Sequence, residues 1–165
     1  IAEIDHRDRS WLSKVFSGNT GAYIDVEITV PPGIHLNIDD GSGDLEISNL
    51  RQSVQLEDSS GNAYIRNIRG SLSVDDGSGD LEIREIDGDL DIEDGSGDVE
   101  VNRVGGDLTI DDGSGDIEIT RIGGSVEVDD GSGDIRIDTV TRDVRIIDSG
   151  SGDLRIARVE GAERH

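Results

Sequence analysis

Short runs of aliphatic, polar and aliphatic residues recur along most of the chain, separated by turns rich in Gly, Ser and Asp. Residues 77–94 show the pattern most clearly, with a first half GSGDLEIRE and a second half IDGDLDIED. Each half places aliphatic residues at its fifth and seventh positions, on either side of a polar residue. Because strand side chains alternate between two faces, each half predicts a short strand with one face buried.

The spacing of the turns defines an internal repeat. Gly-Ser-Gly turns begin at Gly41, Gly77, Gly95, Gly113, Gly131 and Gly150, with a degenerate copy at Ser59. The interval is the same from Gly41 through to Gly131, and the step to Gly150 is one position longer. The sequence therefore predicts an all-β fold, a two-sided parallel β-solenoid of the β-roll type with 18 residues per coil and about seven coils. The longer interval predicts a bulge around residues 147–149.

Stacked coils are expected to place equivalent aliphatic residues above one another at the ~4.8 Å spacing of neighbouring strands. One sheet should contribute the columns Leu45/Ala63/Leu81/Val99/Ile117/Ile135/Leu154 and Ile47/Ile65/Ile83/Val101/Ile119/Ile137/Ile156. The other should contribute Val54/Leu72/Leu90/Leu108/Val126/Val144 and Leu56/Val74/Ile92/Ile110/Val128/Ile146. These four columns are the predicted core.

The two edges of the predicted tube differ in chemistry. The second half of each repeat opens with an aliphatic residue that can fold inward and seal its edge: Leu50, Ile68, Ile86, Val104, Ile122, Val140 and Val159. The first half carries Gly or Ser there, so the opposite edge should hold only Gly, Ser and Asp.

Residues 1–38 do not follow the repeat, which is assigned to residues 39–165. An amphipathic helix is predicted over residues 8–16 and a strand over residues 23–30. This segment is interpreted either as a cap on the first coil or as a docking segment for a neighbouring subunit. Because the chain begins at Ile1, we expect a trimmed chain or a mature form left after removal of a signal peptide.

The charge of the chain limits the classes of partner that it is expected to bind. The sequence holds 38 acidic and 15 basic residues, for a formal net charge of −23. Phosphate would be repelled, so a nucleic-acid partner is not expected, whereas divalent cations are. The sequence contains no apolar run of about 20 residues, the length of a membrane span.

Columns of aspartate flank the Gly-Ser-Gly turns. Carboxylates stacked ~4.8 Å apart repel one another, so bound cations, proton uptake or hydrogen bonds from turn amides must offset the repulsion. Calcium suits such oxygen-rich turns. The candidate ligands are Asp40, Asp44, Asp76, Asp80, Asp94, Asp98, Asp112, Asp116, Asp130, Asp134, Asp148 and Asp153. The alternative is that Asp and Ser only form the turns and keep the surface soluble.

The run from Ile24 to Val159 resembles a family of bacterial envelope and secreted repeat proteins described as adhesins of unknown function. The resemblance lies in the VPPG segment at residues 30–33 and in the recurring GSGD-aliphatic and GGDL or GGSV units. It implies an exported β-solenoid, extracellular or at the cell surface or in the periplasm, with an interaction or scaffold role.

Two functions are compatible with these features. The first is a structural subunit that stacks head to tail into an extracellular fibre. Residues 75–133 carry 20 acids and 3 bases, whereas residues 134–165 carry 7 and 6. The C-terminal end is therefore much less acidic than the middle, which lowers the electrostatic barrier to end-to-end contact. The second is a monomeric adhesion or binding module. An enzyme is not expected, since the chain has no cysteine and His6, His35 and His165 lie outside the repeat core.

Overall fold

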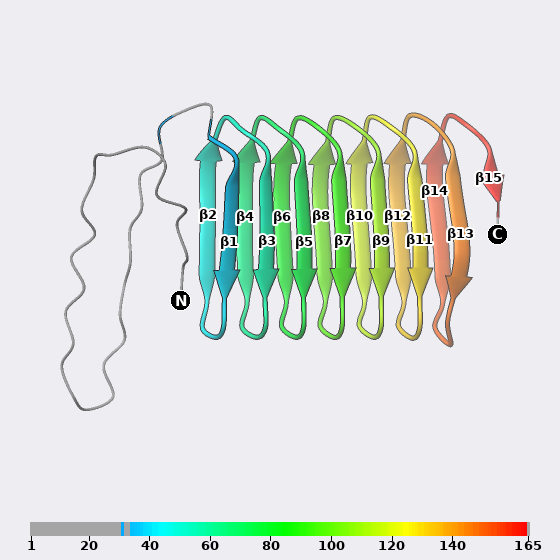
Figure 1. Ribbon diagram of the computed structural model, residues 1–165. Helices are drawn as coiled ribbons and strands as arrows, with labels where there is room; N and C mark the ends of the chain where they lie inside the picture. Colours follow the sequence, from blue (N-terminus) through cyan, green and yellow to red (C-terminus); the bar gives the residue numbers. More distant parts are fainter. Residues whose placement is uncertain (1–30, 32–33, 165) are drawn as a thin grey trace.

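The computed structural model describes residues 31 and 34–164, which form a flattened tube of two parallel β-sheets (Figure 1). The eight-stranded sheet, called sheet A, contains β1 (Leu36–Asp40), β3 (Val54–Asp58), β5 (Leu72–Asp76), β7 (Leu90–Asp94), β9 (Leu108–Asp112), β11 (Val126–Asp130), β13 (Val144–Ser149) and β15 (Glu163–Arg164). The seven-stranded sheet, called sheet B, contains β2 (Leu45–Leu50), β4 (Ala63–Ile68), β6 (Leu81–Ile86), β8 (Val99–Val104), β10 (Ile117–Ile122), β12 (Ile135–Val140) and β14 (Leu154–Val159).

Each coil contributes one strand to each sheet, and every strand pairs in parallel with its equivalents in the neighbouring coils. Leu36 lies opposite Val54, and Leu45 lies opposite Ala63, so the register advances by one sequence repeat per coil. Strands β1 to β14 make seven coils, and β15 begins the next one. The predicted two-sided parallel β-solenoid is confirmed.

The predicted columns form the core of the tube. Within them, Leu56, Ala63, Ile83, Ile92, Ile119 and Val128 are fully buried. Only the coils at the two ends are less enclosed, where Leu45, Leu154 and Ile156 are partly buried against the same cluster. Repetition therefore produces one continuous core from short strands, each of which would be unstable alone.

A backbone kink in every strand of sheet B turns the edge-sealing aliphatic residue inward. Strand pairing passes from Arg84↔Asn102 to Ile86↔Val104, which leaves Glu85 unpaired on the outside. Glu85 has a φ of 61°, and the same left-handed conformation recurs at Asn49, Asn67, Arg103, Arg121, Thr139 and Arg158. Two outward residues in succession reverse the alternation, so Ile86 points into the tube and is buried. The predicted apolar edge is confirmed.

The Gly-Ser-Gly turns form the other edge, along the bottom of Figure 1. In the turns that contain Gly61 to Gly133, the second glycine lies against its equivalent in the preceding coil and has a positive φ, from 131° at Gly61 to 154° at Gly133. A Cβ atom on Gly79 would lie 1.8 Å from the carbonyl oxygen of Gly61. Only glycine allows this backbone conformation and this approach.

The predicted bulge is confirmed in β13. Pairing shifts between Val128↔Ile146 and Asp129↔Asp148, so Ile147 is the additional residue, and it is 51% exposed. At the other end, β1 begins at Leu36 and crosses the expected boundary between residues 38 and 39. The helix predicted over residues 8–16 and the strand predicted over residues 23–30 lie outside the described residues. The described part contains no helix that is long and apolar enough to cross a membrane.

Candidate functional site

Three columns of acidic residues run along the Gly-Ser-Gly edge. The buried column consists of Asp58, Asp76, Asp94, Asp112 and Asp130, at the ends of β3, β5, β7, β9 and β11. The turn column follows the turns and consists of Asp44, Asp80, Asp98, Asp116, Asp134 and Asp153, all exposed. The outer column lies on the outward face of sheet A and consists of Asp39, Glu57, Asp75, Glu93, Asp111, Asp129 and Asp148.

The buried column points into the tube, which is unexpected for a polar edge. Its five aspartates are only 1–5% exposed. In each, Oδ1 accepts a hydrogen bond from the backbone N–H two residues later, such as Ser96 N–H to Asp94 Oδ1 at 3.1 Å. The same turn geometry recurs at Ser60, Ser78, Ser114 and Ser132. The buried carboxyl groups therefore stabilise the turns by accepting hydrogen bonds from the backbone N–H groups of the turn serines.

The second oxygen of each buried aspartate is not satisfied. Oδ2 of Asp58, Asp76, Asp94, Asp112 and Asp130 is buried and has no hydrogen-bond partner among the described residues. A buried acceptor without a donor destabilises the folded state, and an ionised one does so more strongly.

Burial raises the pKa of these carboxyl groups above their ordinary value. It raises the pKa of Asp94 to about 7, with a further rise from Asp112 and Asp76 and an opposing effect from the N–H groups of Ser96 and Gly95. Burial likewise raises the pKa of Asp76 and of Asp112 to about 6 each. The pKa values of Asp58 and Asp130 are raised for the same reason. The column thus favours the protonated form in a range where free aspartate is ionised.

The turn column is organised by hydrogen bonds between coils. Asp80 Oδ1 accepts the backbone N–H of Asp98 at 3.2 Å, and Asp98 Oδ1 accepts that of Asp116 at 3.0 Å. The ladder continues through Asp134 to Asp153, and Asn62 replaces aspartate in the degenerate coil. These bonds are one of the expected offsets to carboxylate repulsion, and they leave the second oxygen of each carboxylate for solvent or a cation.

The structure divides the predicted calcium ligands between different surfaces. Asp76, Asp94, Asp112 and Asp130 are in the buried column, whereas Asp44, Asp80, Asp98, Asp116, Asp134 and Asp153 are in the turn column. Asp40 is partly buried, and the bulge turns Asp148 outward. Within residues 34–164, no three acidic or histidine side chains converge in a group that could hold a metal ion.

A second polar ladder, which the sequence analysis did not identify, runs along the opposite edge. Asp89 Oδ1 accepts the N–H of Asp107 at 3.0 Å, and Asp107 Oδ1 accepts that of Ser125 at 2.7 Å. Ser53, Ser71 and Asp143 make equivalent bonds. The available signal was a Ser or Asp before the first aliphatic residue of the second strand, recurring in every repeat.

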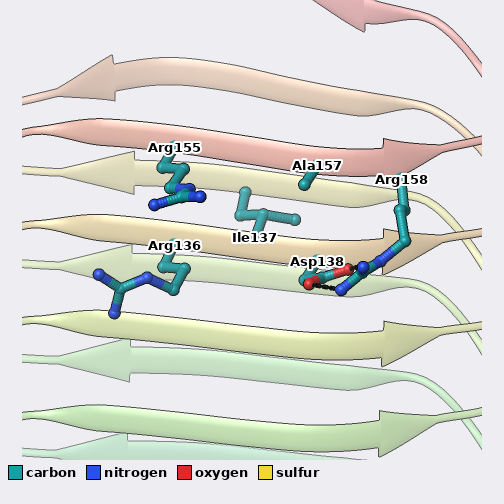
Figure 2. A pocket seen from close by; sticks show the side chains of 6 residues that line it. All are labelled: Arg136, Ile137, Asp138, Arg155, Ala157 and Arg158. Carbon is teal, nitrogen blue, oxygen red and sulfur yellow. Dashed lines mark hydrogen bonds and ion pairs between the residues drawn. The ribbon is translucent and has the colours of Figure 1, made fainter.

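The tube is not symmetric in charge from end to end. On the outward face of sheet B, one in-register column reads Glu46, Tyr64, Glu82, Glu100, Glu118, Arg136 and Arg155. Figure 2 shows Arg136 and Arg155 on the same side of adjacent strands, where they line a pocket together with Asp138 and Arg158. Arg158 pairs with Asp138 and lowers the pKa of that carboxyl group. Arg136 and Arg155 form no ion pair with any other described residue.

On sheet A the equivalent outward column is neutral at its start, at Asn37, Gln55 and Ser73, and becomes basic at its C-terminal end. Glu127 pairs with Arg145 at 3.0 Å, and Arg164 follows Arg145 in register. We call Arg136, Arg145, Arg155 and Arg164 the basic collar. Like charges on adjacent strands repel one another, so the collar concentrates unfavourable positive charge near the C-terminal end of an otherwise acidic protein.

The fold and these edges define the class of protein: a two-sided parallel β-solenoid with short, two-stranded coils, an acidic turn edge and a basic collar near one end. Within that class the chain belongs to the Toastrack DUF4097 family of unknown function, whose profile matches residues 5–165. No curated protein and no solved structure matches the chain.

Proposed function

We propose that this protein is an exported structural protein whose solenoids stack end to end into an extracellular fibre. The observation that carries the proposal is the change of sign along the outward column of sheet B. Glu46 begins the sheet B column, and Arg155 ends it. A second copy that continued this column would place its Glu46 beside Arg155, so the charges at the two ends are complementary.

The terminal strand β14 offers a suitable surface for such a copy. Its side chains Leu154, Ile156 and Val159 are only partly buried. They occupy the positions that Leu45, Ile47 and Leu50 occupy in β2, so the two strands match in length and side-chain order. An available strand edge pairs readily with another strand, and a head-to-tail contact continues without closure. The incoming β1 would take the place of the short terminal strand β15 beside β13.

Export and calcium binding are parts of the same proposal. Export is supported by the resemblance to secreted and envelope repeat proteins. Calcium would bind along the turn column, where each carboxylate keeps one oxygen outside the ladder that joins the coils. Sites made of few exposed carboxylates are weak, and they suit the millimolar affinities of extracellular calcium modules.

Sedimentation velocity and negative-stain imaging of the full chain, over a range of concentrations and with calcium, test the fibre. We expect rods one tube wide that lengthen with concentration. Arg155→Glu should abolish the rods, and so should Glu46→Arg, whereas the double variant should restore them. Glu100→Arg makes the same charge change in the middle of the column and serves as the control, because it should leave the rods intact.

Monodisperse single particles at high concentration with calcium would contradict the fibre. In that case the alternative, a monomeric cell-surface or periplasmic adhesion module, becomes the better proposal.

A further inference from the structure

The buried column has a structural role in the turns, but that role uses only one oxygen of each carboxyl group. The remaining oxygens, Oδ2 of five successive coils, face the interior without a donor among the described residues. Asp58, Asp76, Asp94, Asp112 and Asp130 occupy equivalent positions in adjacent strands, so each carboxyl group has another one a single strand spacing away. Five adjacent anions in a buried position would repel one another strongly.

Every charged side chain that shifts the pKa values of the buried column is itself acidic. Within sheet A these groups are Asp40 at one end of the column and Asp148 at the other, together with Asp75, Asp111 and Asp129 of the outer column. From the turns they are Asp98 and Asp116. The rest of the tube interior is the aliphatic core. In the described part of the chain, no Arg, Lys or His side chain offsets the charge of these five aspartates.

We propose that the buried column is a proton-binding site, in which the Oδ2 atoms of these carboxyl groups carry protons when the tube is folded. Each proton taken up converts one carboxylate into a neutral carboxyl group and removes its repulsion with the coils on either side. The proton comes from solvent on folding and returns to solvent on unfolding. The site is a row that crosses several coils, so its proton affinity belongs to the row as a whole.

The raised pKa values agree with this arrangement. The value is highest at Asp94, in the middle of the column, where burial raises the pKa most and Asp112 and Asp76 raise it further. The bulge at Ile147 ends the row, because it turns Asp148 outward and places Ser149 opposite Asp130. The inserted residue therefore sets the length of the proton-binding row at the C-terminal side.

Infrared spectroscopy of the full chain tests the proposal, because a protonated carboxyl group has a carbonyl stretch distinct from that of a carboxylate. We expect the protonated band to persist at pH 6.5 in the folded protein and to be lost on unfolding in urea. The folded chain should bind more protons than the unfolded chain at that pH, and Asp94 should contribute the largest share. Potentiometric titration of the two states measures this difference.

A matched pair of variants assigns the band. Replacement of all five buried aspartates by Asn should remove it. Replacement of Asp80, Asp98, Asp116, Asp134 and Asp153 by Asn removes the same number of charges from the turn column and should leave it in place. Should the first variant not fold, ¹³C-carboxyl NMR titration of the unaltered protein decides the question alone.

A folded protein at pH 6.5 without the protonated band would overturn the proposal. A band that disappears when calcium or sodium is added at constant pH would also overturn it, because a cation would then be the natural occupant of the column.

Discussion

Gly97 lies directly over Gly79 of the preceding coil, so closely that a Cβ atom on Gly97 would lie 1.8 Å from the Gly79 carbonyl oxygen. The φ of Gly97, 144°, is also one that other residues rarely adopt. We expect Gly97→Ala to lower the free energy of unfolding by roughly 2–5 kcal/mol, because both the backbone and the neighbouring coil must shift. Urea denaturation measures the change.

Gly41 is the control for that substitution. A Cβ atom at Gly41 would have nothing within 4 Å, and its φ lies outside the positive range. Gly41→Ala should change the free energy of unfolding by no more than about 0.5 kcal/mol. Equal effects at the two glycines would show that close stacking of the turns is not what makes glycine necessary.

Thr139 is the least suited of the seven residues in the left-handed kink, because a β-branched side chain is strained at its φ of 62°. Asn tolerates this conformation, so Thr139→Asn should raise the free energy of unfolding by about 1 kcal/mol. The reverse change in another coil, Asn67→Thr, should lower it by a similar amount, since Asn67 has a φ of 56°. Thermal unfolding followed by circular dichroism measures both.

Thr109 provides the same substitution in ordinary strand conformation, at an exposed position of β9. Thr109→Asn should lower the stability by a few tenths of a kcal/mol, because Thr has the higher strand propensity. If Thr139→Asn and Thr109→Asn shift the midpoint in the same direction, the kink is not a source of strain.

The stability of the fold should fall as the pH rises from about 4 to 7. The pKa of Asp94 is raised from 3.8 to about 7, and the pKa values of Asp76 and Asp112 are raised from 3.8 to about 6. The folded state therefore binds more protons than the unfolded state in this window, so their contribution is complete below pH 3.8 and is lost as the pH passes the raised values. Urea midpoints between pH 4 and 8 measure the slope.

A single substitution should reduce that slope. Asp94→Asn keeps the Oδ1 acceptor for Ser96 N–H and removes the charge, so we expect it to raise the free energy of unfolding at pH 8 by about 1–3 kcal/mol. At pH 4, where Asp94 is already neutral, the change should be small. Asp80→Asn is the control, because it removes a charge from the exposed turn column. If both variants alter the slope equally, net charge explains the pH dependence and burial does not.

Calcium should raise the thermal unfolding midpoint at low salt. A ligand that binds only the folded state adds about 1.4 kcal/mol per site when present at ten times its Kd. A variant in which Asp80, Asp98 and Asp116 are all Asn should lose most of this effect. Magnesium at the same ionic strength controls for screening, and a midpoint unchanged between calcium and chelator would remove calcium from the proposed function.

The repeat period made most of the fold predictable. Once the turns showed a constant interval, residues such as Ile83 and Val101 had to stack, and aliphatic alternation placed them inside. The left-handed kink was harder to predict from the sequence, because Glu85 and Arg103 have no preference for that conformation. Its signal was the pair of polar residues between two aliphatic ones, as in Ile83-Arg84-Glu85-Ile86.

The placement of the aspartates was only partly predictable, because the alternation of the strand places Asp58 inside the tube whereas the polar turn residues predict an acidic edge outside it. Strict alternation from Val54 and Leu56 places Asp58 on the inner face, and the structure follows the alternation. The expectation of a polar, acidic edge followed from the Gly and Ser residues that replace the edge-sealing aliphatic residue in the first half of each repeat. The hydrogen bond from Ser60 N–H offsets part of the cost of burying a carboxylate, and it depends on turn geometry that the sequence does not specify.

The regular stacking of the coils determines how the length of the tube can change. Each coil adds one strand to each sheet and pairs only with the coils beside it, so the distance between the two ends grows in steps of ~4.8 Å. Gain or loss of one whole repeat would move whatever is attached to either end by one such step and leave the cross-section of the tube unchanged. The number of repeats therefore sets the distance between the two ends of the tube in steps of one coil.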